Sequence, residues 1–193
     1  MTAALTEEEI HRYSRQILLG AVGGEGQRAL LRTCARVRGT SQALMTAAAY
    51  LAAGGTPLKW IETHPSGGFW VGVATDASAG SQSSAGEPCL SEGLLGEGGA
   101  VFAGSAPWVA LGSRGGVGAV VFRGEEGCLP CFAARVSELG PPAEGAPATA
   151  LGALAALLFQ RLLVQRGPAL GVVQQDALGG FATVSGAPCE HSR

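Results

Sequence analysis

Apolar positions at the beginning of the chain recur every three to four residues, which is the spacing of an amphipathic helix. Within residues 5–20, Ile10 and Tyr13 fall on this period, and Thr6 precedes three glutamates as a plausible N-cap. Residues 25–32 repeat the same pattern. The sequence therefore predicts two helices at the N-terminus, the first of them covering residues 5–20.

The next segment alternates between short apolar runs and one alanine-rich helix. Residues 34–38 predict a strand, a glycine-containing turn follows, and residues 41–53 predict a helix with Ser41 as its cap. Residues 58–62 predict a second strand. Strand, helix and strand in this order indicate a βαβ unit and a parallel sheet.

The pattern is lost in the middle of the chain and returns after Gly99. Residues 76–99 are rich in Gly, Ser and Ala without any period, so we expect a loop there. We expect strands at 69–74, 100–103, 108–111 and 118–122, a long helix at 149–166, and a closing hairpin of residues 171–176 and 181–184.

Composition limits the protein class. A chain of 193 residues with 47% hydrophobic and 15% charged residues predicts one globular domain, 1–193. The formal charge of −2 has no basic block, which argues against nucleic-acid binding. The longest apolar stretch, 150–164, is broken by Gln160 and Arg161 and is too short to span a bilayer. With an acidic N-terminus and no apolar signal region, we expect a cytoplasmic protein.

Several stretches resemble the ThiF/MoeB/HesA family, whose enzymes activate ubiquitin-like sulfur carrier proteins. The first is IHRYSRQILL at 10–19, followed by GQRAL at 26–30, and the second is AAAYLAAGG at 47–55. The C-terminal half resembles the family at 120–132, 151–166, 176–184 and Pro188-Cys189. The resemblance skips roughly residues 63–98. It implies a doubly wound, mostly parallel, Rossmann-like α/β sheet with an N-terminal helical arm (1–33), a degenerate nucleotide-binding unit (34–62) and a C-terminal half (99–193), usually as a dimer.

The family's nucleotide site is depleted in this chain. Family enzymes bind ATP with a G-x-G-x-x-G turn, in which glycines let the backbone approach phosphates. Here the turn reads GTSQAL from Gly39 to Leu44, and only the first glycine survives. Glu62 falls where the family places an acidic residue for the ribose, although it could equally be a surface carboxylate. The family's S-N-L-x-R-Q and T-D-N motifs are missing, so we expect little ATP/Mg²⁺ chemistry from this chain alone.

Arg15 holds the position of a family arginine that reaches across the dimer into the partner's ATP site. The alternative is that Arg12 and Arg15 are solvated surface residues. The first possibility predicts a catalytically impaired subunit of a homo- or heterodimer, contributing Arg15 to a full-length ThiF/MoeB-like partner. Such a subunit would position the tail of a carrier protein. Residues 115–118 would form a tail-binding edge, or simply a glycine-rich connection between strands.

Four residues form a candidate structural zinc site. Cys128 and Cys131 have the spacing of half a tetrahedral site. The family places a second cysteine pair near the C-terminus; here Cys189 is present, and His191 replaces the second cysteine as a candidate imidazole ligand. Cysteines without metal, or with a redox role, remain alternatives.

Two further functions stay open. The first is an active adenylyltransferase in which Arg36, Arg38 or Arg114 replaces the lost phosphate ligands. The second is a zinc or redox protein on this fold, since fold does not fix function. Of the remaining cysteines, we expect Cys34 in a buried strand and Cys89 in an exposed loop.

Overall fold

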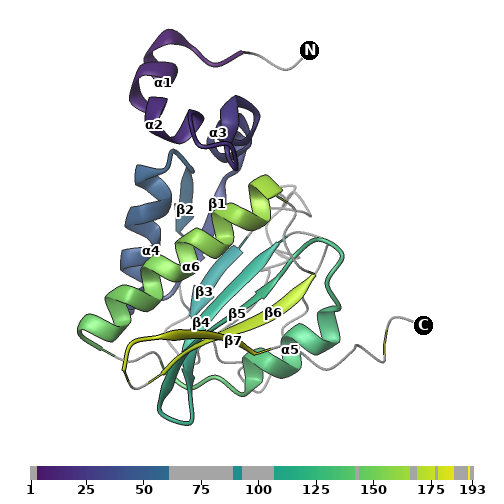
Figure 1. Ribbon diagram of the computed structural model, residues 1–193. Coiled ribbons are helices and arrows are strands. Elements are labelled where there is room, and N and C mark those ends of the chain that lie inside the picture. Colours follow the sequence, from purple (N-terminus) through teal and green to yellow (C-terminus); the bar gives the residue numbers. More distant parts are fainter. Residues whose placement is uncertain are drawn as a thin grey trace.

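The computed structural model describes residues 4–60, 89–92, 107–141, 144–165, 169–176, 178–184 and 191. Within these residues, seven strands form one sheet with the order β2-β1-β3-β4-β5-β6-β7 (Figure 1). The strands are β1 (Ala35–Arg38), β2 (Leu58–Trp60), β3 (Cys89–Glu92), β4 (Trp108–Arg114), β5 (Val117–Arg123), β6 (Leu170–Gln175) and β7 (Phe181–Val184).

The sheet has a parallel half and an antiparallel half. β2, β1, β3 and β4 run parallel to one another, whereas the pairs β4–β5, β5–β6 and β6–β7 are antiparallel. The predicted α/β class is therefore confirmed, but the sheet is mixed and not mostly parallel. The predicted βαβ unit and the closing hairpin β6–β7 are both present.

Helices cover both faces of the sheet. Side chains of β4 alternate between two hydrophobic clusters, with Val109 in one and Trp108 in the other, as the pleat of a strand requires. The Val109 cluster packs under α4 (Gln42–Ala53) and α6 (Ala146–Gln165), which lie side by side in Figure 1. The Trp108 cluster packs against α5 (Leu129–Ser137).

The N-terminal arm comprises α1 (Glu7–Arg12), α2 (Ser14–Ile17) and α3 (Gly23–Arg32) and lies beyond one end of the sheet in Figure 1. The predicted cap is confirmed: Thr6 Oγ1 accepts the Glu9 N–H, and the Glu9 carboxylate accepts the Thr6 N–H in return. The prediction of one helix over residues 5–20 is wrong. The helix breaks at Tyr13, whose buried ring lies against the end of α4.

Two elements were missed in the sequence. β3 lies inside the segment expected to be a loop, so Cys89 is on a strand between β1 and β4. The second missed element is α5, which begins directly after Cys128. Cys34 was expected in a strand, but it precedes β1 and is a half-buried free thiol. The strands expected at 69–74 and 100–103 lie outside the described residues.

Residues 115–118, the candidate tail-binding edge, do not lie at an edge of the sheet. Gly115 and Gly116, with φ of +59° and +81°, form the two-residue turn of the β4–β5 hairpin. β4 pairs with β3 and β5, and β5 pairs with β4 and β6, so neither strand offers a free edge. The glycine run is thus the connection between strands that the sequence also allowed.

α6 is the one described helix that is long and apolar enough to cross a membrane by length and composition. Its residues Leu151, Ala155 and Phe159 are fully buried in the cluster over the sheet. The sequence-based expectation that the apolar stretch 150–164 is too short to span a bilayer is therefore wrong on length, because the helix extends to 20 residues, although part of it packs in the core.

Candidate metal centre

Cys128, Cys131 and His191 come together although 60 residues separate Cys131 from His191. Their potential ligand atoms all lie within 4.8 Å of one another, and Cys131 Sγ lies 3.6 Å from His191 Nδ1. Ligand atoms around a tetrahedral zinc ion are about 3.7 Å apart, given Zn–S distances of about 2.3 Å. Three of the four predicted ligands thus lie close together and could hold one metal ion. The fourth, Cys189, lies outside the described residues.

The beginning of α5 places the two thiols. Cys128 is the N-cap of the helix, and its Sγ accepts the N–H of Cys131 at 3.5 Å. Pro130 in the first turn is preorganised for a helix start. Phe132, the residue after Cys131, is fully buried, with its ring centroid 6.3 Å from that of Trp108. The core of the protein therefore fixes the direction in which both sulfur atoms point.

A metal-binding role suits the chemistry of this cluster. Thiolate and imidazole are the ligands that zinc prefers, and both cysteines are free thiols that are half-buried. His191 is exposed and approaches from the C-terminal end of the chain. An ion held here would join the C-terminal segment to α5.

Arg123 is a neighbour of this site that sequence reasoning missed. It is the last residue of β5, it is 2% exposed, and its Nη1 donates to the Gly127 carbonyl at 3.3 Å. Burial lowers the pKa of the Arg123 guanidinium, and the charge of the Cys128 sulfur acts in the opposite direction. An arginine at the end of an otherwise apolar strand was the signal that could have revealed it.

The beginning of α4, where the resemblance predicted a degenerate phosphate-binding turn, is occupied by contacts within the chain. Ser41 Oγ accepts the N–H of Leu44 at 3.2 Å, and the Leu44 side chain is fully buried. The side-chain amide of Gln42 accepts the Gly145 N–H at 2.9 Å and donates to Thr149 Oγ1 at 3.2 Å. These bonds tie the first turn of α4 to the first turn of α6.

Of the two residues proposed to contact a cofactor, Gly39 lies in the turn between β1 and α4, with a φ of +120° that favours glycine. Glu62 lies outside the described residues.

The arginines considered for phosphate binding lie in different places. Arg36 is buried within β1, and Arg114 pairs with Glu138 at 2.8 Å. Arg15 is exposed on α2, in the helical arm, and Arg12 lies 5.6 Å from the centre of the Tyr13 ring. The exposure of Arg15 is compatible both with a solvated surface residue and with a reach into a partner.

The N-terminal segments that carry the family resemblance meet at the end of α4. Gln27 is fully buried and its Nε2 donates to the Gly54 carbonyl at 3.0 Å. A Cβ atom at Gly55 would lie 2.9 Å from Tyr13 Cζ and 3.0 Å from Gln27 Nε2. The glycine pair that ends α4 therefore makes room for the arm, and these motif residues have a defined structural role here.

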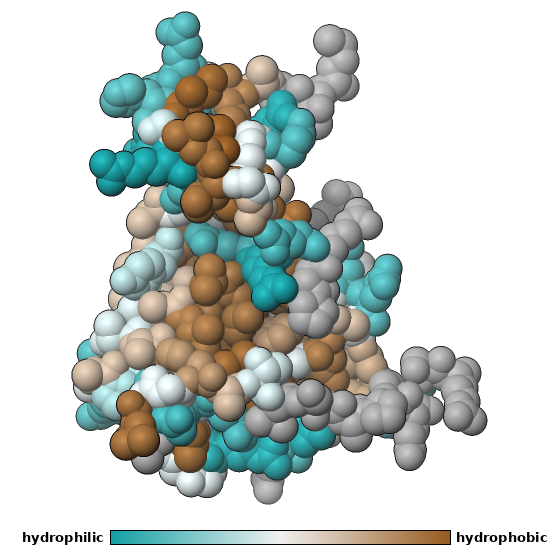
Figure 2. Space-filling view, viewed as in Figure 1, coloured by the Kyte–Doolittle hydropathy of each residue, from teal (hydrophilic) through white to brown (hydrophobic). Residues whose placement is uncertain are grey.

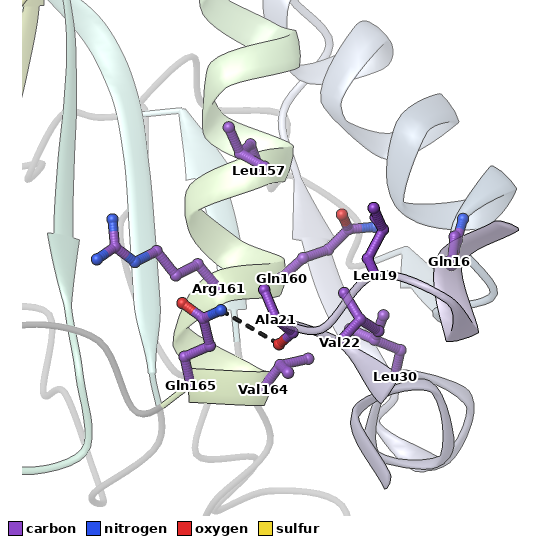
Figure 3. Close-up of a pocket in the computed structure, with 10 residues that line it drawn as sticks. All are labelled: Gln16, Leu19, Ala21, Val22, Leu30, Leu157, Gln160, Arg161, Val164 and Gln165. Atoms are coloured by element: carbon purple, nitrogen blue, oxygen red, sulfur yellow. Dashed lines mark hydrogen bonds between the residues drawn. The ribbon is translucent and has the colours of Figure 1, made fainter. Parts of the chain in front are cut away.

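An apolar groove runs between the arm and α6 (Figure 3). Its volume is about 390 Å³, and its apolar lining includes Leu19, Val22, Leu30, Leu157 and Val164. Gln165 Nε2 donates to the Ala21 carbonyl at 3.1 Å, which is the dashed line in Figure 3, while the Arg161 guanidinium points away from the arm. Figure 2 shows brown apolar surface on the arm and on the body below it.

No family model matches the chain, and a search of curated proteins found no match.

Proposed function

We propose that this protein is a binding subunit of the ThiF/MoeB/HesA kind, acting in the activation of a ubiquitin-like or sulfur-carrier protein. It does not adenylate its substrate, and a metal ion joins its C-terminal segment to α5. In this role it dimerises with a full-length ThiF/MoeB-like protein, to whose ATP site it contributes Arg15, or with itself. The support for this family lies in its sequence motifs, and the support for a non-catalytic role lies in the structure.

The observation that supports a non-catalytic role is that the first turn of α4 is closed, meaning that the Leu44 N–H and the Gln42 side chain are already hydrogen-bonded within the chain. A phosphate bound at a helix N-terminus needs backbone N–H groups that point at it and glycines that let it approach. Here the Leu44 N–H is bonded to Ser41 Oγ, and Gln42 is bonded to the first turn of α6. Binding ATP in the family manner would require both arrangements to open.

The surface of the arm supports a role in association. Ile10, Leu18 and Leu19 are 48%, 83% and 57% exposed, and Leu157 on α6 is 61% exposed across the groove. Leu19 and Leu157 line the groove, and exposed apolar residues grouped on one surface are typical of protein-binding sites. The same arm carries Arg15, so association through the arm would bring this cation to the partner.

The metal that suits the cluster is zinc, with Cys128, Cys131 and His191 as three ligands and Cys189 as the fourth. The Cys189 assignment comes from the sequence. Bound zinc would supply a structural crosslink between α5 and the C-terminal segment, with all four positions filled by protein.

A dithiol redox protein is the second candidate. It is favoured by one observation, the position of Cys128 at the start of a helix with the Cys131 N–H directed at its sulfur, because this geometry is typical of reactive C-x-x-C motifs. The two functions differ in metal content. A stoichiometric zinc ion in the purified protein supports the structural site, whereas a reversible Cys128–Cys131 disulfide in metal-free protein supports the redox role.

The proposed role of Arg15 in the partner's ATP site is tested in a reconstituted pair with a full-length ThiF/MoeB-like protein from the same source. We expect Arg15→Ala to lower ATP–pyrophosphate exchange by the pair by about 10³-fold, as loss of an arginine finger does. Arg12→Ala is the matched control on the same arm and should leave exchange nearly unchanged. Equal rates for Arg15→Ala and the unaltered pair would contradict the proposal.

A further inference from the structure

The loop between β5 and α5 is built around the side chain of Arg123. The Gly124 N–H donates to the Ala169 carbonyl at 2.9 Å, and the Gly127 N–H donates to the Gly124 carbonyl at 3.1 Å. A Cβ atom at Gly127 would collide with the Ala169 carbonyl and with Cγ of Arg123. The glycine therefore lets the arginine stem lie against the backbone directly before Cys128.

This packing places a guanidinium in the interior beside a metal-ligand candidate. Arg123 is 2% exposed, and its Nη1 donates to the Gly127 carbonyl, one residue before Cys128. Burying a cation costs several kcal/mol unless a negative charge compensates for it. Cys128 follows the Gly127 carbonyl that Arg123 binds, and its thiol becomes negative when it binds a metal.

We propose that Arg123 is a positioning residue of the metal centre, which fixes the Cys128 loop through the Gly127 carbonyl and offsets the negative charge of the metal-bound Cys128 thiolate. This inference rests on the proposed metal site. Groups that contact metal ligands from outside orient them and tune their affinity for the ion. Here the group bound to the carbonyl next to the ligand is a cation, so it favours a charged sulfur ligand over a neutral one.

The test compares zinc affinities of the full chain and its variants, measured by competition with a chromophoric chelator. We expect Arg123→Gln, which retains a donor for the Gly127 carbonyl but loses the charge, to weaken zinc binding about 10- to 100-fold. Arg123→Lys should recover most of this loss because it restores the charge. Arg135→Gln, on the last turn of α5, is the control and should bind zinc like the unaltered protein.

A second background separates charge compensation from general structural support. Cys128→His keeps a zinc ligand but makes it neutral, so adding Arg123→Gln there should cost less than about threefold. If Arg123→Gln fails to fold by circular dichroism, Arg123→Met replaces it in both backgrounds. Equal losses in the unaltered and the Cys128→His backgrounds, or no loss in either, would overturn the role of Arg123.

Cobalt(II) distinguishes failure of this inference from failure of the metal centre. Thiolate coordination gives cobalt an intense charge-transfer absorption, which the unaltered protein should show. Absence of this band overturns the metal centre and this inference with it. A normal band together with unchanged zinc affinity of Arg123→Gln overturns the role of Arg123 alone.

Discussion

Gly55 is the residue at which the helical arm meets the body of the protein. Its φ of +92° is a conformation that side chains other than glycine rarely adopt, and the ring of Tyr13 fills the space where a Cβ atom would stand. Gln27, bonded to the neighbouring Gly54 carbonyl, completes the contact. A few residues therefore fix the position of the whole arm relative to α4.

We predict that Gly55→Ala lowers the free energy of unfolding by about 2–4 kcal/mol, because backbone strain adds to the clash with Tyr13 and Gln27. Gly115→Ala is the matched control, since its φ is also positive but open space surrounds the residue. It should cost only about 1–2 kcal/mol. Urea unfolding measures both values, and equal losses would show that Tyr13 does not depend on the glycine.

Residue-level expectations from the sequence succeeded where the chemistry is local. Ser41 was expected to cap a helix because serine oxygen accepts N–H groups of the first turn, and it does. The grouping of Cys128 and Cys131 with His191 was expected from ligand type and from the family pattern. Arg123 was missed because its importance comes from burial beside Cys128, which depends on how β5 meets α5.

At the scale of elements, the sequence predicted the long helices well and the short elements poorly. α4 and α6 have many periodic apolar residues, and their ends lie within three residues of the predicted ones. β3 has four residues in a glycine- and serine-rich segment, and its pairing with β1 and β4 is a property of the sheet. α5 was hidden because the cysteine spacing suggested a turn and not a capped helix.

Because α4 packs closely on α6, we predict that a glycine-to-alanine substitution in α6 lowers the stability of the protein instead of raising it. A Cβ atom at Gly152 would collide with the Ala43 carbonyl and lie 2.8 Å from Thr46 Cβ. Replacing a helical glycine by alanine normally stabilises a helix by about 1 kcal/mol. We expect Gly152→Ala instead to destabilise the protein by about 1–2 kcal/mol, because overpacking outweighs the helix propensity.

The control for this prediction is Gly24→Ala in α3, where open space surrounds the glycine. This change should stabilise the protein by about 0.5–1 kcal/mol. Thermal and urea unfolding show directly whether each of the two variants is more or less stable than the unaltered protein. A stabilising Gly152→Ala would mean that α4 and α6 are not in close contact at this point.

For the whole molecule, the mixed sheet separates two regions. The parallel half carries α4, whose first turn is closed, and the antiparallel half leads through β5 to α5 and the metal-ligand candidates. The α/β class could be predicted from the order of strands and helices. The direction of β5 could not, because a two-residue glycine turn reverses the chain where the family pattern suggested a different role.

A metal ion in this centre should stabilise the entire domain, because it binds only when α5 and the C-terminal segment are together. Zinc at about 100 times its Kd should raise the free energy of unfolding by about 2.7 kcal/mol. Cys131→Ser should abolish this gain, while Cys34→Ser, which alters a thiol outside the cluster, should keep it. Chelation by EDTA should remove the gain in stability. If Cys131→Ser keeps the gain, the zinc binds elsewhere.

We expect the closed first turn of α4 to prevent nucleotide binding, which titration calorimetry of Mg²⁺-ATP into the purified full chain can measure. The titration should give no heat beyond dilution, which corresponds to a Kd weaker than about 1 mM. A saturable isotherm with a Kd of a few micromolar would contradict it, because ATP would then be bound despite the contacts of Ser41 and Gln42.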